Sequence, residues 1–166
     1  MPEKVALITG AARGIGLETA RLFIEQGWRV ALVDRDSEAL KDSTDGLNET
    51  SSFICDISEP KEVDSMVNKV TSTFGRIDAV VNNAGVADFG PIETTDFAQW
   101  RKIMQTNLDG TFLVSQACLP TLKKTRGAIV NIASISGLRA STLRVGYGTS
   151  KAAVIQLTKQ QAVELG

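Results

Sequence analysis

Tyr147 and Lys151 are the two residues whose types and spacing most directly suggest chemistry. They stand four positions apart in a stretch that predicts a helix over residues 147–165, so they share one helix face and can touch. A free phenol has a pKa of about 10, too high for a base at neutral pH, and a nearby ammonium group lowers that value. A tyrosine in this position could take a proton from an alcohol, or give it back in reduction.

The sequence contains no histidine among its 166 residues. Histidine is the commonest metal ligand and the commonest general base, so its absence excludes Ser-His-Asp hydrolysis, zinc-peptidase chemistry and papain-like chemistry. Any proton transfer must therefore use tyrosine, lysine, cysteine or a carboxylate.

A glycine-rich turn follows the first apolar run, residues 4–9, and precedes a helical pattern over residues 14–26. Strand, glycine turn and helix N-terminus together make a phosphate-binding geometry, because backbone N–H groups and the helix dipole point at the anion. Gly10, Gly14 and Gly16 are spaced G-x-x-x-G-x-G, which differs from the standard dinucleotide spacing G-x-G-x-x-G. A tight packing turn is the alternative, and the acidic residue after the second strand favours phosphate binding.

That acidic residue is Asp34, at the end of the second apolar run. A carboxylate in this position of a dinucleotide fold accepts hydrogen bonds from the ribose hydroxyls of NAD and repels the extra phosphate of NADP. A solvated loop aspartate or a helix cap is the alternative. Arg13 and Arg35 could instead pair with a 2′-phosphate. We expect NAD as the coenzyme and NADP as the less favoured one.

Strand and helix patterns alternate along the chain, joined by short loops. This alternation is typical of a parallel sheet covered by helices on both faces, with right-handed crossovers. We expect one domain over residues 1–166, an α/β fold. Apolar runs predict strands over residues 4–9, 29–34, 52–55, 77–81 and 128–132, and helical patterns cover residues 14–26, 37–47, 58–75, 100–122 and 147–165.

Composition is that of an ordinary globular protein, 43% hydrophobic and 22% charged. A formal net charge of −1 argues against nucleic-acid and membrane-surface partners, which usually require a basic excess. No apolar run is long enough to span a bilayer, and the first residues lack a signal-peptide pattern. Two isolated cysteines, Cys55 and Cys118, do not make a disulfide framework, so we expect a cytoplasmic protein.

Three motifs in order resemble those of the short-chain dehydrogenase/reductase family: Thr9 to Gly16, Asn82-Asn83-Ala84-Gly85, and Tyr147-Gly148-Thr149-Ser150-Lys151. Each motif alone is weak, but the three together on the expected elements are specific. The resemblance implies a doubly wound Rossmann-type sheet of strand order 3-2-1-4-5. It also implies an NAD(P)-dependent oxidoreductase that interconverts a secondary alcohol and a ketone. Such enzymes are often oligomers, and we expect a homo-oligomer formed through the long helices.

The resemblance also assigns roles to individual residues. It implies a catalytic tetrad, in which Ser134 would bind the substrate oxygen and Asn107 would kink its helix and order a water near Lys151. A helix cap or an exposed polar residue is the alternative for Ser134 and Asn107, and Ser136 is a weaker candidate than Ser134. The implied tetrad is Asn107, Ser134, Tyr147 and Lys151, and the implied coenzyme contacts are Gly10, Arg13, Gly14, Ile15, Gly16, Asp34, Asp56, Ile57, Asn83, Ala84, Gly85, Tyr147 and Lys151.

Members of that family usually continue beyond the helix that carries the tyrosine, with two more strands and a substrate-covering loop. We therefore expect a C-terminally truncated family member whose fifth strand, residues 128–132, is an open apolar sheet edge. A catalytically silent NAD-binding fragment, acting only by association with other subunits, is the alternative function. Residues 138–145 would edge the substrate pocket, where Arg139 and Arg144 are either solvated cations or contacts for an anionic substrate.

Overall fold

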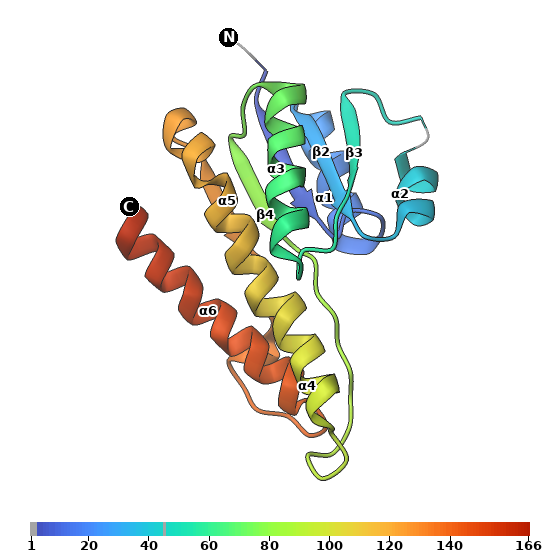
Figure 1. The fold of residues 1–166 in the computed structure, drawn as a ribbon, viewed down its shortest axis with the longest axis vertical. Helices are drawn as coiled ribbons and strands as arrows, with labels where there is room; N and C mark the ends of the chain where they lie inside the picture. Colours follow the sequence, from blue (N-terminus) through green and yellow to red (C-terminus); the bar gives the residue numbers. More distant parts are fainter. Residues whose placement is uncertain (1–2, 45) are drawn as a thin grey trace.

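The computed structural model describes residues 3–44 and 46–166. Five parallel strands form one sheet in the order β3-β2-β1-β4-β5, which confirms the expected Rossmann-type order (Figure 1). The observed strands are β1 (Val5–Thr9), β2 (Arg29–Asp34), β3 (Thr50–Ile54), β4 (Ala79–Asn82) and β5 (Ala128–Asn131).

The central strands are buried on both faces, as a nearly continuous apolar run predicts. Val5 and Leu7 of β1 pack with α3 (Pro60–Phe74) and α5 (Gly110–Thr125), whereas Ala6 and Ile8 pack with α1 (Gly14–Glu25) and α2 (Ser37–Thr44). Successive residues of a strand point to opposite faces, so one strand contributes to two apolar layers. The core therefore consists of two layers of apolar side chains, one on each face of the sheet formed by β1, β2 and β4.

The helices follow the predicted pattern, with differences at their ends. α2 ends at Thr44 rather than at Leu47, and residue 45 of the predicted helix lies outside the described residues. The helix expected over residues 100–122 starts earlier, because the Asp96 carboxylate accepts the Gln99 amide at 2.7 Å and caps it. The observed segments are α4 (Phe97–Met104), a π-helical turn, η1 (Gln105–Asp109), and α5, followed by a short 3-10 turn, η2 (Ile135–Gly137), and α6 (Val145–Leu165).

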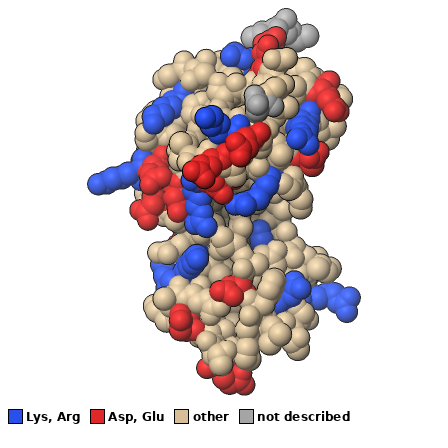
Figure 2. All heavy atoms as spheres, turned by 90° about the vertical axis from the view of Figure 1, so that its right-hand side faces the viewer, with Lys and Arg blue, Asp and Glu red and all other residues tan. Residues whose placement is uncertain are grey.

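Charges of both signs are interspersed on the face of the molecule that Figure 2 shows, without a large patch of one sign. This distribution agrees with the formal net charge of −1. Among residues 3–44 and 46–166, no helix has the length and apolar character needed to cross a membrane.

The edge strand β5 differs from its neighbours in exposure. Within the described chain it pairs only with β4, and Val130 keeps 50% of its surface exposed. An apolar edge strand leaves unpaired backbone N–H and C=O groups that can pair with another chain.

We expect the chain to associate through this edge, in a concentration-dependent way. Val130→Lys should weaken the association, because edge lysines disfavour strand pairing. The measurement is sedimentation velocity over a range of protein concentrations. Leu22→Lys, which adds the same charge at a 57% exposed site on α1, is the matched control. A chain that stays monomeric throughout, or equal effects of both variants, would contradict this expectation.

Candidate functional site

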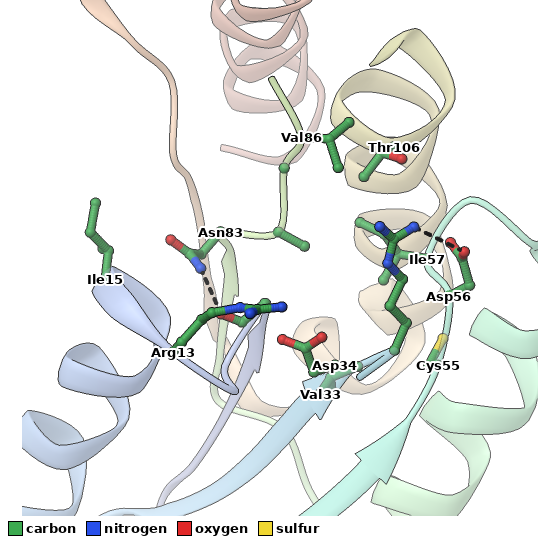
Figure 3. Close-up of a pocket in the computed structure, with 14 residues that line it drawn as sticks. Arg13, Ile15, Val33, Asp34, Cys55, Asp56, Ile57, Asn83, Val86 and Thr106 are labelled. Carbon is green, nitrogen blue, oxygen red and sulfur yellow. Dashed lines mark hydrogen bonds and ion pairs between the residues drawn. The ribbon is translucent and has the colours of Figure 1, made fainter. Parts of the chain in front are cut away.

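A pocket of about 370 Å³ lies where β1, β2 and β4 end and the loops that follow them converge (Figure 3). Parallel strands present all their carboxyl ends at one edge of a sheet, so loops distant in sequence meet there. Nine of the residues predicted to contact coenzyme line this pocket: Gly10, Arg13, Ile15, Asp34, Asp56, Ile57, Asn83, Ala84 and Gly85. Arg35, considered above as a contact for a 2′-phosphate, also lines it, and four further lining residues have no assigned role in the sequence pattern: Val33, Cys55, Val86 and Thr106.

The turn after β1 packs directly against the segment after β4. Gly10 has a φ of +64°, and a Cβ atom there would lie 2.8 Å from the Cα of Ala84. A Cβ atom on Gly16 would overlap the carbonyl oxygen of Gly10 and lie 2.6 Å from Nδ2 of Asn83. Glycine is therefore required at both positions, and Gly16 shapes the turn from behind the pocket. Gly14, at φ +57°, has open space where its Cβ would be.

Thr9 and Asn83 hold these two segments together. The buried Thr9 hydroxyl accepts hydrogen bonds from the amides of Asn83 and Ala84, each at 3.1 Å. The Asn83 side chain donates in return to the carbonyls of Thr9 and Gly10, also at 3.1 Å. The only sequence signal for Thr9 is its place at the end of a strand beside the glycine turn.

Asp34 points into the pocket from the end of β2 (Figure 3). Its carboxylate accepts the amides of Ala12 and Asp36, each at 3.1 Å, which leaves further lone pairs on both oxygens. The cap of α2 is provided by Asp36, which accepts the Ala39 amide at 3.1 Å. The helix-cap alternative for Asp34 is therefore wrong.

Both arginines at the mouth of the pocket have an acidic partner. Arg13 pairs with Asp36 at 3.1 Å, and Arg35 pairs with Asp56 at 3.6 Å. Burial raises the pKa of Asp56, but hydrogen bonds from Ser58 and the charge of Arg35 outweigh it and leave that pKa below its ordinary value. The carboxylate of Asp56 is thus kept ionised beside Arg35.

Cys55 also lines this pocket, with its thiol buried. Burial, together with the charges of Glu62 and Asp56, raises the pKa of this thiol to about 12. A thiol with so high a pKa is a poor nucleophile, so Cys55 acts as a small apolar wall.

Lys151 lies in the first turns of α6 with only 5% of its surface exposed. Its Nζ donates to the carbonyl oxygen of Ile132 at 2.7 Å, directly after β5, and lies 6.0 Å from the centre of the Tyr147 ring. Burial lowers the pKa of Lys151, because an ammonium group loses hydration there. The structure thus brings the two residues of the Tyr–Lys pair to one face of α6.

Asn107 lies in the π-helical turn η1, fully buried. Its Oδ1 accepts the Val86 amide at 2.8 Å, and its Nδ2 donates to the Val86 carbonyl and the Ser150 hydroxyl, each at 2.9 Å. π-helical turns inside α-helices are frequent at functional sites, and this one takes the place of the expected kink. The side chain contacts the segment after β4 rather than Lys151 itself.

Ser134 caps the short turn η2, where its hydroxyl accepts the Ser136 amide at 3.2 Å. Its remaining lone pair and its proton are left for another partner. Ser136, the weaker candidate, is buried and accepts a hydrogen bond from Arg144 at 3.1 Å. η2 packs closely on α6, since a Cβ atom on Gly137 would lie 2.7 Å from the backbone of Lys151.

Tyr147 contacts the loop after β4 through Phe89, with ring centres 6.3 Å apart and nearly perpendicular. The guanidinium of Arg144 lies over the Phe89 ring, 4.9 Å from its centre. Arg144 is thus held by Ser136 and Phe89, whereas Arg139 is exposed. Of the two proposed loop cations, only Arg139 is fully solvated.

Gly85 joins the two halves of the site. It lines the pocket, and a Cβ atom there would lie 3.3 Å from Oδ1 of Asn107 and 3.5 Å from Nζ of Lys151. At Gly85 the pocket therefore borders on the buried side chains of Asn107 and Lys151.

Comparison with known proteins agrees with this geometry. The pattern of the family described as short chain dehydrogenase matches residues 4–166. The chain belongs to this family. It is 38% identical to meso-2,3-butanediol dehydrogenase of Serratia marcescens over 165 residues, 98% of this chain and 66% of that protein. It is 35% identical to L-fucose dehydrogenase of Oryctolagus cuniculus, covering 97% of this chain and 57% of that protein.

The fold is likewise similar to solved structures of the family. The crystal structure of an NAD⁺-bound xylitol dehydrogenase superposes with a TM-score of 0.93 at 34% identity, covering 98% of this chain and 65% of that one. The chain spans about two thirds of the length of the dehydrogenases it matches.

The two glycines of the turn make a matched test of this packing. Gly16→Ala should lower the free energy of unfolding by about 3 kcal/mol, because the new methyl group displaces the Gly10 carbonyl. Gly14→Ala should cost only about 1 kcal/mol, the penalty of a left-handed conformation in open space. Urea unfolding of both variants measures the difference in the free energy of unfolding. Equal losses in the two variants would show that the close packing of Gly16 against Gly10 does not contribute to stability.

Proposed function

We propose that this protein is an NAD-dependent oxidoreductase that interconverts a secondary alcohol and a ketone. The observation that carries the proposal is the position of Gly85, which lines the pocket and lies beside both Asn107 and Lys151. A dinucleotide lying along the pocket would end beside the one tyrosine of the sequence. Family membership supports the same reaction class.

The pocket suits a dinucleotide in shape and in donor set. The turn Gly10–Gly16 would hold the pyrophosphate at the N-terminus of α1, where Gly14 leaves open space. Asp34 would accept the adenosine ribose hydroxyls, with Asp56 and Ile57 against adenine. Asn83, Ala84 and Gly85 would border the nicotinamide side. When bound, the nicotinamide ring would supply the acceptor or donor of hydride.

NAD is favoured over NADP by the charges around Asp34. A 2′-phosphate would meet the Asp34 carboxylate, and each arginine that could offset this repulsion is paired with an acid, Asp36 or Asp56. A 2′-phosphate would therefore compete with Asp36 or Asp56 for an arginine.

The tetrad residues would divide the proton chemistry among them. Tyr147 would take the alcohol proton, and Lys151 would supply positive charge beside the phenol. The Ser134 hydroxyl, whose proton is free of the η2 cap, would donate to the substrate oxygen. Asn107 would hold the Val86 segment in place at the edge of the pocket.

The open edge of β5 favours a second candidate, a coenzyme-binding fragment that acts through association with other subunits. Apolar side chains are exposed on α4 and α5, such as Phe97 at 74% and Phe112 at 44% exposure. They support a homo-oligomer for both candidate functions. Turnover separates the two candidates.

Coenzyme choice tests the role of Asp34. We expect the unmodified chain to bind NADH more tightly than NADPH in a calorimetric titration. Asp34→Ala should weaken NADH binding by about tenfold, which corresponds to the free energy of one hydrogen bond to a charged group. It should also reduce the preference for NADH over NADPH. Asp42→Ala, which removes the same charge from the exposed surface of α2, should change neither affinity. Equal or tighter NADPH binding by the unmodified chain would rule out this role.

Removal of the phenol hydroxyl tests the reaction itself. Tyr147→Phe should lower turnover on a panel of small secondary alcohols and ketones by about a hundredfold or more, with NADH affinity nearly unchanged. Phe89→Leu, which alters the ring packed on Tyr147 but keeps the phenol, should lose far less activity. Turnover by Tyr147→Phe at the unmodified rate would refute the mechanism. Coenzyme binding without any turnover by the unmodified chain would favour the second candidate.

A further inference from the structure

We propose that Ser150 is a positioning residue that anchors the Asn107 amide to α6 and so joins the edge of the coenzyme pocket to the helix of Tyr147 and Lys151. The expected effect of Ser150 on turnover rests on the proposed function. The hydrogen bonds that Ser150 makes do not depend on it. Ser150 stands between the two motif residues of α6, and none of the roles assigned above uses it.

Ser150 is fully buried, and both functions of its hydroxyl are used. It donates to the carbonyl oxygen of Tyr147 at 2.8 Å and accepts from Nδ2 of Asn107 at 2.9 Å. A serine hydroxyl has one proton, so a proton committed to Tyr147 leaves the oxygen to act only as an acceptor toward Asn107.

This commitment favours one orientation of the Asn107 amide, the same one that the Val86 amide and carbonyl favour. With Nδ2 directed at Ser150, Oδ1 is directed at the Val86 amide, which it accepts at 2.8 Å. The reverse orientation would place the NH₂ group against the Val86 N–H and Oδ1 against a hydroxyl without a free proton. Only one orientation satisfies all the groups, since a buried donor facing a donor is costly.

The result is a hydrogen-bonded chain with a single direction, from the Val86 amide through Asn107 and Ser150 to the Tyr147 carbonyl. Val86 lines the coenzyme pocket, and Tyr147 begins the catalytic pair. Hydrogen bonds in such a chain polarise and strengthen one another. Ser150 therefore couples the pocket edge to the tyrosine, across elements that are distant in sequence.

Thr149 provides a matched control on the same helix. Its hydroxyl also donates to a backbone carbonyl of the preceding turn, that of Val145 at 2.6 Å, but the side chain is exposed. Truncation at Thr149 thus removes the same kind of local helix contact without touching Asn107.

Amide hydrogen exchange at Val86 tests the coupling directly. In Ser150→Ala, exchange of this amide should be about tenfold faster or more, because the Asn107 side chain loses its anchor on α6 and releases the Val86 amide more often. Thr149→Ala should leave the rate unchanged. Ser150→Cys fills similar space with a much weaker acceptor, so it should also speed the exchange while preserving packing should the alanine variant fail to fold. Unchanged Val86 exchange in a folded Ser150 variant would overturn the proposal.

Steady-state kinetics then separates positioning from general stability. Ser150→Ala should lower kcat by about tenfold per folded molecule and leave the KM for NADH within about twofold, because the adenosine end of the site is untouched. A loss of activity that follows only the folded fraction would refute positioning. Failure of the unmodified chain to bind NADH would overturn the proposed function instead, and Val86 exchange would still decide whether Ser150 holds Asn107.

Discussion

The parallel pairing of β1 with β4 is the constraint on which the rest of the site depends. These strands are distant in sequence, yet their register sets Ile8 beside Val81, so the chain leaves both strands at the same level of the sheet. The glycine turn and the Asn83–Gly85 segment then compete for the same space. They fit because two glycines lack side chains and because one threonine hydroxyl satisfies two amides. The pocket lies where these two segments and the loops after β2 and β3 converge.

The buried polar side chains of Asn107 and Lys151 also find their hydrogen-bond partners at the carboxyl ends of the strands. Asn107 and Lys151 are buried, and each is satisfied by backbone just beyond a strand: Val86 beyond β4 and the Ile132 carbonyl beyond β5. Burying an ammonium group costs free energy, which is why the pKa of Lys151 is lowered. The site that we propose for proton transfer therefore also reduces stability, and packing elsewhere in the sheet must offset this cost.

Local pattern was sufficient to predict the order of the strands along the chain, the glycine turn, the place of Asp34 at the end of β2 and the shared helix face of Tyr147 and Lys151, because each depends on spacing within a few residues. It was insufficient where the outcome depends on distant neighbours. Whether Arg13 and Arg35 are available to a phosphate depends on Asp36 and Asp56, which only the folded chain brings near them. The π-helical turn at Asn107 has no local signal either, since its side chain finds Val86 and Ser150 only after β4 and α6 are in place.

The exposed edge of β5 has a consequence for Tyr147 and Lys151. The carbonyl that accepts the Lys151 ammonium belongs to Ile132, one residue past β5, and the side chain of Asn131 binds Thr158 and Gln161 on α6. Among the residues that the structure describes, β5 is hydrogen-bonded to a strand on one side only, so it opens more readily than the central strands. Any partner that pairs with this edge would also hold Ile132 and α6. Association at β5 and the position of Lys151 are therefore physically linked, and the activity of the site should depend on what covers the sheet edge.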